Sequence, residues 1–163
     1  MQALQEINAL GHERGLELFS RCCVAKEYAL AMVNAMPFAS VVALESASDL
    51  ATLSLTQAGL LEGFSGHPRI GDRKVHSAWS SAEQSGLDSA QDKVLTALHE
   101  ANISYEKKFD HVFLICATGK TADFMLAQCL RRIENSPTIE IEEAREQLRL
   151  INLIRIHKIL DVA

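Results

Sequence analysis

The sequence predicts an all-α protein, folded as a compact helical bundle in a single domain over residues 1–163. Three observations support this prediction. Apolar residues recur at the period of a helix over most of the chain, and the strong helix formers alanine and leucine are abundant. Prolines occur only at positions 37, 68 and 137, where a helix can end or begin. A chain of 163 residues is also long enough to bury a hydrophobic core without disulfides or bound metal.

The N-terminal part of the chain is expected to form three helices. The first spans roughly residues 13–36 and ends at Pro37, which cannot continue a helix. Ser40 can cap a second helix over residues 41–50, because its side-chain oxygen can accept a hydrogen bond from the first helical turn. Thr56 can cap a short third helix in the same way.

A loop rich in glycine and proline, residues 63–72, separates these helices from the central part of the chain. After this loop, Ser77 is expected to open a helix that ends at Gly86, because glycine often terminates helices. Asp88 is expected to begin a further helix, in which apolar residues follow at helical spacing.

The C-terminal part contains one ambiguous segment between helices. Residues 112–117 form a short apolar run that could be a strand or a buried turn of helix, since periodicity alone does not distinguish the two. Residues 121–134 are expected to form a helix, and Ser136 and Pro137 are expected to begin the last one. One ambiguous run among so many helices favours the all-α class.

Composition and charge exclude several classes of partner. The net charge of −5 argues against nucleic acid or an anionic membrane as the main partner, since both attract basic surfaces. No apolar run reaches the length of a membrane span, and no N-terminal secretory signal is recognisable. The cysteines lack the spacing of a zinc site and favour reduced thiols in a cytoplasmic protein without a metal centre. They are Cys22, Cys23, Cys116 and Cys129.

The loop at residues 63–72 contains the first candidate catalytic group, His67. Gly66 and Gly71 free the backbone on either side, while Pro68 fixes it next to the imidazole. A histidine held on a rigid loop suits proton transfer near neutral pH. The alternative is a surface histidine in a turn, which this segment alone favours. The other five histidines lie in helical contexts and indicate no site.

A second candidate is the polar segment at residues 79–86. If this segment is helical, Ser80, Glu83 and Gln84 lie on one face, since residues three and four apart are neighbours on a helix. Their hydroxyl, carboxylate and amide groups together suit a polar ring that carries urea-like groups. The alternative is an exposed polar face, and the segment alone favours it.

A third candidate is the Cys-Ala-Thr-Gly-Lys-Thr segment at residues 116–121. Its Gly-Lys-Thr part is similar to a phosphate-binding loop, but the full pattern needs a glycine five residues before Gly119, where Leu114 stands. The surrounding chain also lacks alternating strands and helices, so nucleotide binding is not favoured. A turn immediately before a helix can still offer backbone N–H groups to an anion or a ligand oxygen.

The fourth candidate is Arg155, in the middle of an apolar arc of the last helix. The apolar residues within about 40° of it on a helical wheel are Ile141, Ala144, Leu148, Ile151 and Ile159. Arg145, Arg149 and Asn152 lie toward another side. Burying a lone charge costs several kcal/mol. Arg155 is therefore expected to extend to solvent, to pair with an internal carboxylate or to bind an anionic substrate.

Together these segments resemble the family of 2-oxo-4-hydroxy-4-carboxy-5-ureidoimidazoline (OHCU) decarboxylases. The similarity extends over nearly the whole chain, and the combination of His-Pro-Arg-Ile-Gly at 67–71 with Glu-Gln-Ser-Gly at 83–86 is specific. The other matching stretches are residues 113–122, residues 146–156, Asn8-Ala9-Leu10 and Pro37-Phe38. The chain departs from the family pattern at residues 21–29 and 149–152 but retains Arg155.

The resemblance implies a compact all-helical fold, no metal, no organic cofactor and, as is often the case in this family, a homodimer. The reaction of this family releases CO2 from OHCU, an anion produced by urate oxidation, and yields (S)-allantoin. The carbon–nitrogen double bond beside the departing carboxylate accepts the electrons, so a cofactor such as pyridoxal phosphate is unnecessary.

The resemblance also implies roles for individual residues. His67 is expected to transfer a proton, Glu83 to orient the imidazole or bind the substrate hydroxyl, and Arg155 to bind the anionic end of the substrate. Further substrate contacts are expected from Pro68, Ser80, Ser81, Ala82, Gln84, Ile115, Cys116, Ala117, Thr118 and Gly119.

Two other functions stay open on the sequence alone. A helical interaction module would place these polar residues on its surface and would have no small-molecule activity that depends on His67. A nucleotide-binding protein that uses Gly119, Lys120 and Thr121 would be stabilised against heat by ATP and magnesium.

Overall fold

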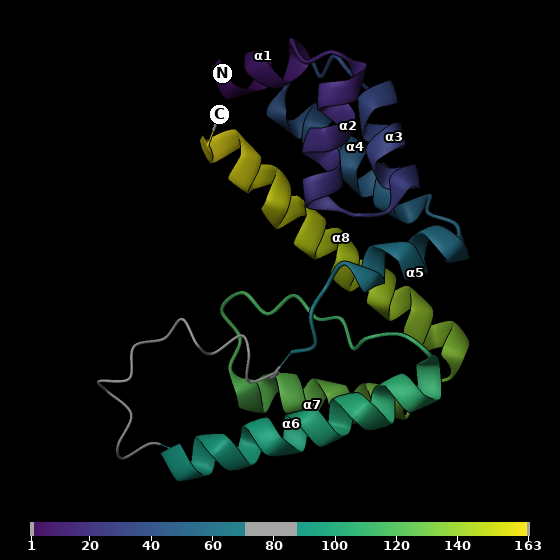
Figure 1. The fold of residues 1–163 in the computed structure, drawn as a ribbon, viewed down its shortest axis with the longest axis vertical. Coiled ribbons are helices and arrows are strands. Elements are labelled where there is room, and N and C mark those ends of the chain that lie inside the picture. Colours follow the sequence, from purple (N-terminus) through teal and green to yellow (C-terminus); the bar gives the residue numbers. More distant parts are fainter. Residues whose placement is uncertain (1, 71–87, 163) are drawn as a thin grey trace. The chain divides into compact units, whose positions relative to one another are not determined.

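The computed structural model describes residues 2–70 and 88–162. Within these residues the chain forms eight α-helices and no β-strand, which confirms the predicted all-α fold (Figure 1). The helices are α1 (Gln2–Asn8), α2 (His12–Cys22), α3 (Lys26–Asn34), α4 (Val41–Leu53), α5 (Gln57–Ser65), α6 (Asp88–Phe109), α7 (Ala122–Ile133) and α8 (Pro137–Val162). None of these helices combines the length and the apolar composition needed to cross a lipid bilayer. The helix expected from Ser77 to Gly86 lies outside the described residues.

The contacts within the chain divide it into two compact units, each of which is described by itself. Unit 1 contains residues 1–66 and 145–163, and unit 2 contains residues 67–144. Helix α8 contributes its first residues to unit 2 and the remainder to unit 1. The single domain expected over residues 1–163 stays a prediction.

The first predicted helix is divided in two, so the expectation of one helix over residues 13–36 is wrong. Helix α2 ends at Cys22 and α3 begins at Lys26, and Cys23 between them has an extended backbone (φ −146°, ψ 129°). Cys22, Cys23 and Ala25 are all fully buried. Neither glycine nor proline marks this break. It arises because the two helices pack against each other, and no local signal in the sequence reveals that.

Helices α2 and α3 approach each other closely at Gly15. A Cβ atom at this position would lie 3.0 Å from Cγ2 of Val33, so a larger residue here would require the Val33 side chain to move. Phe19, Tyr28 and Met32 are fully buried and supply the apolar side chains of the same pair of helices. The interior of unit 1 is therefore formed largely where α2 and α3 meet.

Helices α4 and α5 begin at the predicted caps. Oγ of Ser40 accepts a hydrogen bond from the N–H of Ala43 at 3.1 Å, and Oγ1 of Thr56 accepts from the N–H of Gly59 at 3.1 Å. The N–H and the hydroxyl of Thr56 in turn donate to the Glu27 carboxylate at 2.9 and 2.6 Å. These hydrogen bonds stabilise the ionised form and so lower the pKa of Glu27.

Three polar contacts join helix α4 to the part of α8 that belongs to unit 1. These are Arg149 Nη1 to Asp49 Oδ1 (2.9 Å), Asn152 Nδ2 to Thr52 Oγ1 (3.0 Å) and His157 Nε2 to Glu45 Oε1 (2.7 Å). Asn152, which the helical wheel places on another side of the helix from Arg155, is fully buried because α4 presents a buried hydroxyl, on Thr52, where Asn152 packs.

The N-terminal helix α1 was not predicted from the sequence. Asn8, at its end, makes two hydrogen bonds with the main chain of Phe38. Its Nδ2 donates to the carbonyl oxygen of Phe38, and its Oδ1 accepts from the N–H of Phe38, both at 2.8 Å. The two short stretches at residues 8–10 and 37–38, noted above as similar to the family, are therefore in direct contact.

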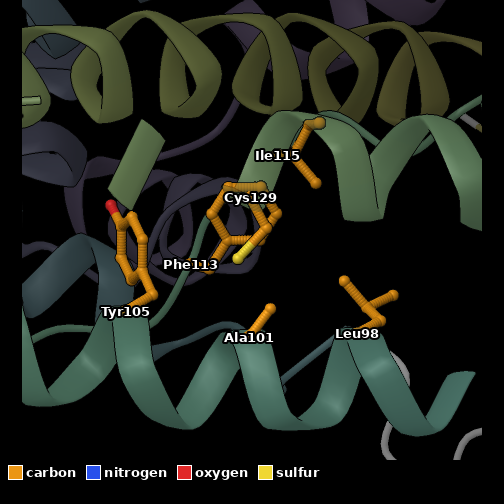
Figure 2. Packing of buried hydrophobic residues seen from close by; sticks show 6 residues of the cluster. All are labelled: Leu98, Ala101, Tyr105, Phe113, Ile115 and Cys129. Carbon is orange, nitrogen blue, oxygen red and sulfur yellow. The ribbon is translucent and has the colours of Figure 1, made fainter. Parts of the chain in front are cut away.

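Unit 2 is built on α6 and α7, which lie side by side (Figure 1). Side chains from both helices and from the segment between them form one hydrophobic core. Figure 2 shows its buried members, Leu98, Ala101, Tyr105, Phe113, Ile115 and Cys129. Leu98, Ala101 and Tyr105 project from one face of α6 at helical spacing, as expected for a helix that packs on one side (Figure 2).

The ambiguous apolar run at residues 112–117 forms neither a strand nor a helix. Phe113, Leu114 and Ile115 are buried, and both Phe113 and Ile115 belong to the core of unit 2. The run is therefore apolar because an irregular segment of backbone passes through the core.

Candidate active site

The residues predicted to form the site fall on separate parts of the chain. His67 and Pro68 follow α5, residues 115–119 lie between α6 and α7, and Arg155 lies on α8. The remaining predicted residues lie outside the described part of the chain. They are Ser80, Ser81, Ala82, Glu83 and Gln84.

The short loop that contains His67 is fixed to α6 in unit 2. Nε and Nη2 of Arg69 donate to the two carboxylate oxygens of Glu106 at 2.6 and 2.5 Å, a bidentate arrangement. Nδ2 of Asn102 donates to the carbonyl oxygen of Ile70 at 2.7 Å, and the Ile70 side chain packs against the hydrophobic core. His67 is half-buried. These contacts give it the rigid support that proton transfer requires.

A tight turn follows the buried segment of unit 2. The N–H of Lys120 donates to the carbonyl oxygen of Ala117 at 3.0 Å, and Gly119 has a φ of +72°, which favours glycine. Oγ1 of Thr121 then caps α7 by accepting a hydrogen bond from the N–H of Phe124 at 3.2 Å. The predicted turn before a helix N-terminus is therefore present.

The backbone of this turn is available to a ligand. Ala117, Thr118 and Gly119 are exposed, Cys116 is half-buried and Ile115 is buried. Within the described part of the chain, the N–H groups of Thr118 and Gly119 donate to no protein acceptor. Two adjacent N–H groups at the start of a helix suit an anion or a carbonyl oxygen.

The hydrophobic core of unit 2 supports both the loop that contains His67 and the turn at residues 117–120. Ile70, next to the loop, packs against the same core cluster that contains Ile115, and α6 supplies one wall of that cluster (Figure 2). The structure therefore brings two of the predicted site segments onto the core of unit 2. The third, Arg155, belongs to unit 1.

Arg155 makes one hydrogen bond within unit 1. Its Nη1 donates to the carbonyl oxygen of Cys22, at the end of α2, at 2.7 Å. Among residues 2–70 and 88–162, no carboxylate forms an ion pair with Arg155. Of the three expected outcomes, pairing with an internal carboxylate therefore finds no support in the described residues. A guanidinium has five N–H donors, so most of those on half-buried Arg155 are not used by residues 2–70 and 88–162.

Two buried thiols lie near Arg155. Burial raises the pKa of Cys22 to about 11, although the positive charge of Arg155 opposes this shift. Burial also raises the pKa of Cys23. Both thiols are therefore neutral at pH 7, and neither Cys22 nor Cys23 has the thiolate that a nucleophile or a metal ligand requires. No group of three or more His, Cys, Asp or Glu side chains in the described ranges is placed to hold a metal ion.

The raised pKa of Cys22 predicts a loss of stability at alkaline pH. The ordinary value is 9.0 and the value in the folded protein is about 11, so folding favours the neutral thiol. The corresponding stability is complete below pH 9 and is lost as the pH rises through about 11, by roughly 2–3 kcal/mol. Urea unfolding under reducing conditions between pH 8 and pH 11 measures this loss.

The matched variant for this measurement is Cys22→Ala. This variant is expected to be less stable than the parent at every pH because it leaves a small cavity. The quantity to compare is therefore the difference between the free energies of unfolding at pH 8 and at pH 11. That difference should be smaller in Cys22→Ala than in the parent. The same pH dependence in both proteins would contradict the prediction.

The sequence did not identify the residues of α6 that hold the histidine loop. Asn102 carried a signal, because a polar side chain next to Ala101 on the apolar face of a helix needs a buried partner. Glu106 carried none, because its partner Arg69 is 37 residues away along the chain.

Known proteins are similar to this chain in sequence and in fold. The model of the OHCU decarboxylase family matches residues 8–157. The chain is 33% identical over 149 residues to the uric acid degradation bifunctional protein TTL of Arabidopsis thaliana. The matched region covers 86% of this chain and 46% of that protein. It is 24% identical over 156 residues to the 2-oxo-4-hydroxy-4-carboxy-5-ureidoimidazoline decarboxylase of Haloferax volcanii, covering 94% of this chain and 93% of that one. This chain thus spans about half of the Arabidopsis protein and nearly all of the Haloferax protein.

Two crystal structures are similar as well. An OHCU decarboxylase crystallised in the presence of (S)-allantoin has a TM-score of 0.71 and 32% identity, covering 88% of this chain and 96% of that chain. An (S)-allantoin synthase has a TM-score of 0.73 over 96% of this chain and 53% of that chain, and at 16% identity it supports the fold alone.

The fold and the comparisons together define the class of this protein, which is an all-α carboxy-lyase. The chain belongs to the OHCU decarboxylase family. This membership confirms the resemblance noted in the sequence.

Proposed function

We propose that this chain decarboxylates OHCU to (S)-allantoin in urate degradation. The observation that carries the proposal is the match of the family model over residues 8–157, nearly the whole chain. A second observation supports the proposal. The core of unit 2 supports both the loop that contains His67 and the turn at residues 117–120, and these two segments offer an imidazole and free backbone N–H groups to a polar anion.

The reaction is balanced without a redox step. The bond between the carboxylate and the hydroxyl-bearing ring carbon breaks, and its electron pair moves into the adjacent carbon–nitrogen double bond. The ring nitrogen and the carbon that bears the ureido arm each take up a proton, while the hydroxyl gives one up as the ring carbonyl forms. The substrate anion therefore takes up one proton overall and releases CO2.

This chemistry assigns a task to each part of the site. His67 transfers a proton, because a supported imidazole exchanges protons readily near neutral pH. The N–H groups of Thr118 and Gly119 bind substrate oxygens, and Arg155 binds the anionic end with the donors that the described residues leave unused. Glu83 orients the imidazole or binds the substrate hydroxyl. The remaining predicted contacts come from Pro68, Ser80, Ser81, Ala82, Gln84, Ile115, Cys116 and Ala117.

The proposal extends to the state of the protein in the cell. The chain acts as a single domain, in the cytoplasm and as a homodimer, with a small anionic substrate and neither nucleic acid nor membrane as partner. The acidic net charge of −5 supports the exclusion of nucleic acid and anionic membranes.

Activity is expected to survive exhaustive chelation. The electron pair released by decarboxylation moves into the substrate itself, so the reaction needs neither a metal nor an organic cofactor. Assays before and after dialysis against a strong chelator measure this, with metal content determined in parallel. Stoichiometric zinc that is lost together with activity would contradict the prediction.

The experiment that tests the proposal uses OHCU prepared fresh from urate, because OHCU decays spontaneously. The rate of OHCU loss should rise in proportion to the protein concentration. An unchanged rate would contradict the proposal and favour a helical interaction module. An unchanged rate together with thermal stabilisation by ATP and magnesium would favour a nucleotide-binding protein that uses Gly119, Lys120 and Thr121.

A further inference from the structure

A buried polar cluster in unit 2 is centred on Arg132, whose side chain is 1% exposed. Its Nε and Nη2 donate to Oε1 of the fully buried Glu140 at 2.9 and 2.5 Å. Oη of Tyr105 donates to the same oxygen, and Nδ2 of Asn135 donates to Oε2 of Glu140 at 2.8 Å. The carboxylate of Glu140 therefore accepts four hydrogen bonds, so the remaining donor group of Arg132, Nη1, is not needed to satisfy it.

One donor of Arg132 points away from the carboxylate, toward the segment at residues 112–117. Nη1 donates to the carbonyl oxygen of Leu114 at 2.8 Å, and the guanidinium carbon lies 4.8 Å from the ring centre of Phe113. This segment is neither helix nor strand, so its buried carbonyl has no partner from regular secondary structure. A single side chain from α7 thus holds two successive residues of an irregular segment.

Stability alone does not account for a charged pair at this position. Apolar residues of similar volume often replace a buried ion pair without loss of stability, or with a gain. An arginine offers something that they do not, because its rigid, planar guanidinium can bind a carboxylate and a carbonyl at the same time. The arrangement is therefore suited to fixing the position of the backbone at Leu114.

We propose that Arg132 is a positioning residue for the turn at residues 117–120: by holding the backbone at Leu114, it sets where the N–H groups of Thr118 and Gly119 meet the substrate. This inference rests on the proposed function, in which that turn binds OHCU. All four residues of the turn are exposed, so side-chain packing does little to hold it. The anchored carbonyl lies three residues before Ala117.

The variant Arg132→Lys separates the two contacts of the arginine. A lysine ammonium can still pair with Glu140, but it lacks the planar fork that reaches Leu114 at the same time. The matched control is Arg131→Lys, on the same helix. Arg131 also pairs with a carboxylate, that of Glu143, but its side chain is half exposed and its hydrogen bonds stay on α7 and α8.

Two measurements on these proteins test the inference. Amide hydrogen exchange, followed by mass spectrometry, is expected to become at least about tenfold faster at residues 115–120 in Arg132→Lys, while α6 keeps the exchange of the parent. KM for OHCU is expected to rise about tenfold or more with a smaller change in kcat, because a misplaced turn weakens binding. Arg131→Lys should match the parent in both measurements.

Two results would overturn the inference. One is Arg132→Lys with the exchange and the KM of the parent. The other is exchange that accelerates equally in α6, α7 and the turn, since this indicates a general loss of stability without a specific effect on the turn. Exchange needs no substrate, so it also separates the two proposals. A parent protein without activity on OHCU would refute the proposed function, and the exchange result would still decide the role of Arg132.

A second variant covers the case in which Arg132→Lys does not fold. The triple variant Tyr105→Phe/Arg132→Met/Glu140→Leu removes the buried ion pair and the tyrosine hydroxyl together, so that neither charge of the pair is left stranded, and Asn135 keeps its hydrogen bond to Glu143. It is expected to melt near the temperature of the parent and to show fast exchange at residues 115–120 with a raised KM. The exchange and the KM of the parent in this variant would refute a positioning role.

Discussion

Replacement of His67 by asparagine is expected to lower kcat for OHCU by about 10²–10⁴-fold, the usual cost of removing a positioned proton-transfer group. Asparagine keeps a polar side chain of similar reach but does not titrate near neutral pH. The fold should persist, because the neighbouring loop is held by the pairing of Arg69 with Glu106 and by the hydrogen bond from Asn102 to Ile70. Steady-state rates together with a thermal melt measure both expectations.

The control for this variant is His99→Asn, which changes an exposed histidine on α6. It should retain the activity and the melting temperature of the parent. A His67→Asn protein that is as active as His99→Asn would exclude His67 from catalysis, whatever the function of the rest of the site.

Replacement of Arg155 by methionine is expected to abolish activity with little loss of stability. The hydrogen bond that the variant loses ends on the carbonyl oxygen of Cys22, and no carboxylate in the described ranges is left stranded. The free energy of unfolding should therefore change by no more than about 1–2 kcal/mol, the scale of one charged hydrogen bond. Arg155→Lys keeps the charge but loses the planar fork, so kcat/KM should fall roughly 10–100-fold.

The neighbouring Arg149 provides the contrast. It pairs with both Asp49 and Glu146, so Arg149→Met leaves two carboxylates without their cation. This variant should lose stability but keep the activity of its folded fraction. If instead Arg155→Met melts far below the parent while its folded fraction turns over normally, Arg155 is structural and does not bind the substrate.

Helix boundaries that depend on local chemistry could be predicted from the sequence. Ser40 and Thr56 cap α4 and α5, and α8 begins at Pro137, because each signal acts within one turn of helix. The start of α6 at Asp88 was predicted in the same way.

Features that depend on distant residues could not be predicted. The break at residues 23–25 contains no helix breaker and exists because α2 packs against α3. The run at residues 112–117 was ambiguous because burial, which periodicity does not reveal, determines its composition. The burial of Asn152 could not be predicted because its buried partner, Thr52, is 100 residues away along the chain.

The candidate site also combines residues that local sequence patterns reveal with residues whose role depends on distant parts of the chain. His67 and Gly119 could be found because a supported histidine and a glycine turn leave local patterns. Arg132 on α7 and Glu140 on α8, the helix that also carries Arg155, are buried charged residues that the sequence did not single out. The sequence could not have paired them, because pairing depends on the packing of α7 against the start of α8.

The optical activity of the allantoin formed from OHCU tests the central claim most directly. Without an enzyme, the carbon that bears the ureido arm is protonated from either face, so both enantiomers form. The proposed function predicts that circular dichroism of (S)-allantoin grows at a rate proportional to the concentration of this protein, with one CO2 released for each allantoin formed. Racemic allantoin that forms at the spontaneous rate in the presence of the folded protein would contradict the account.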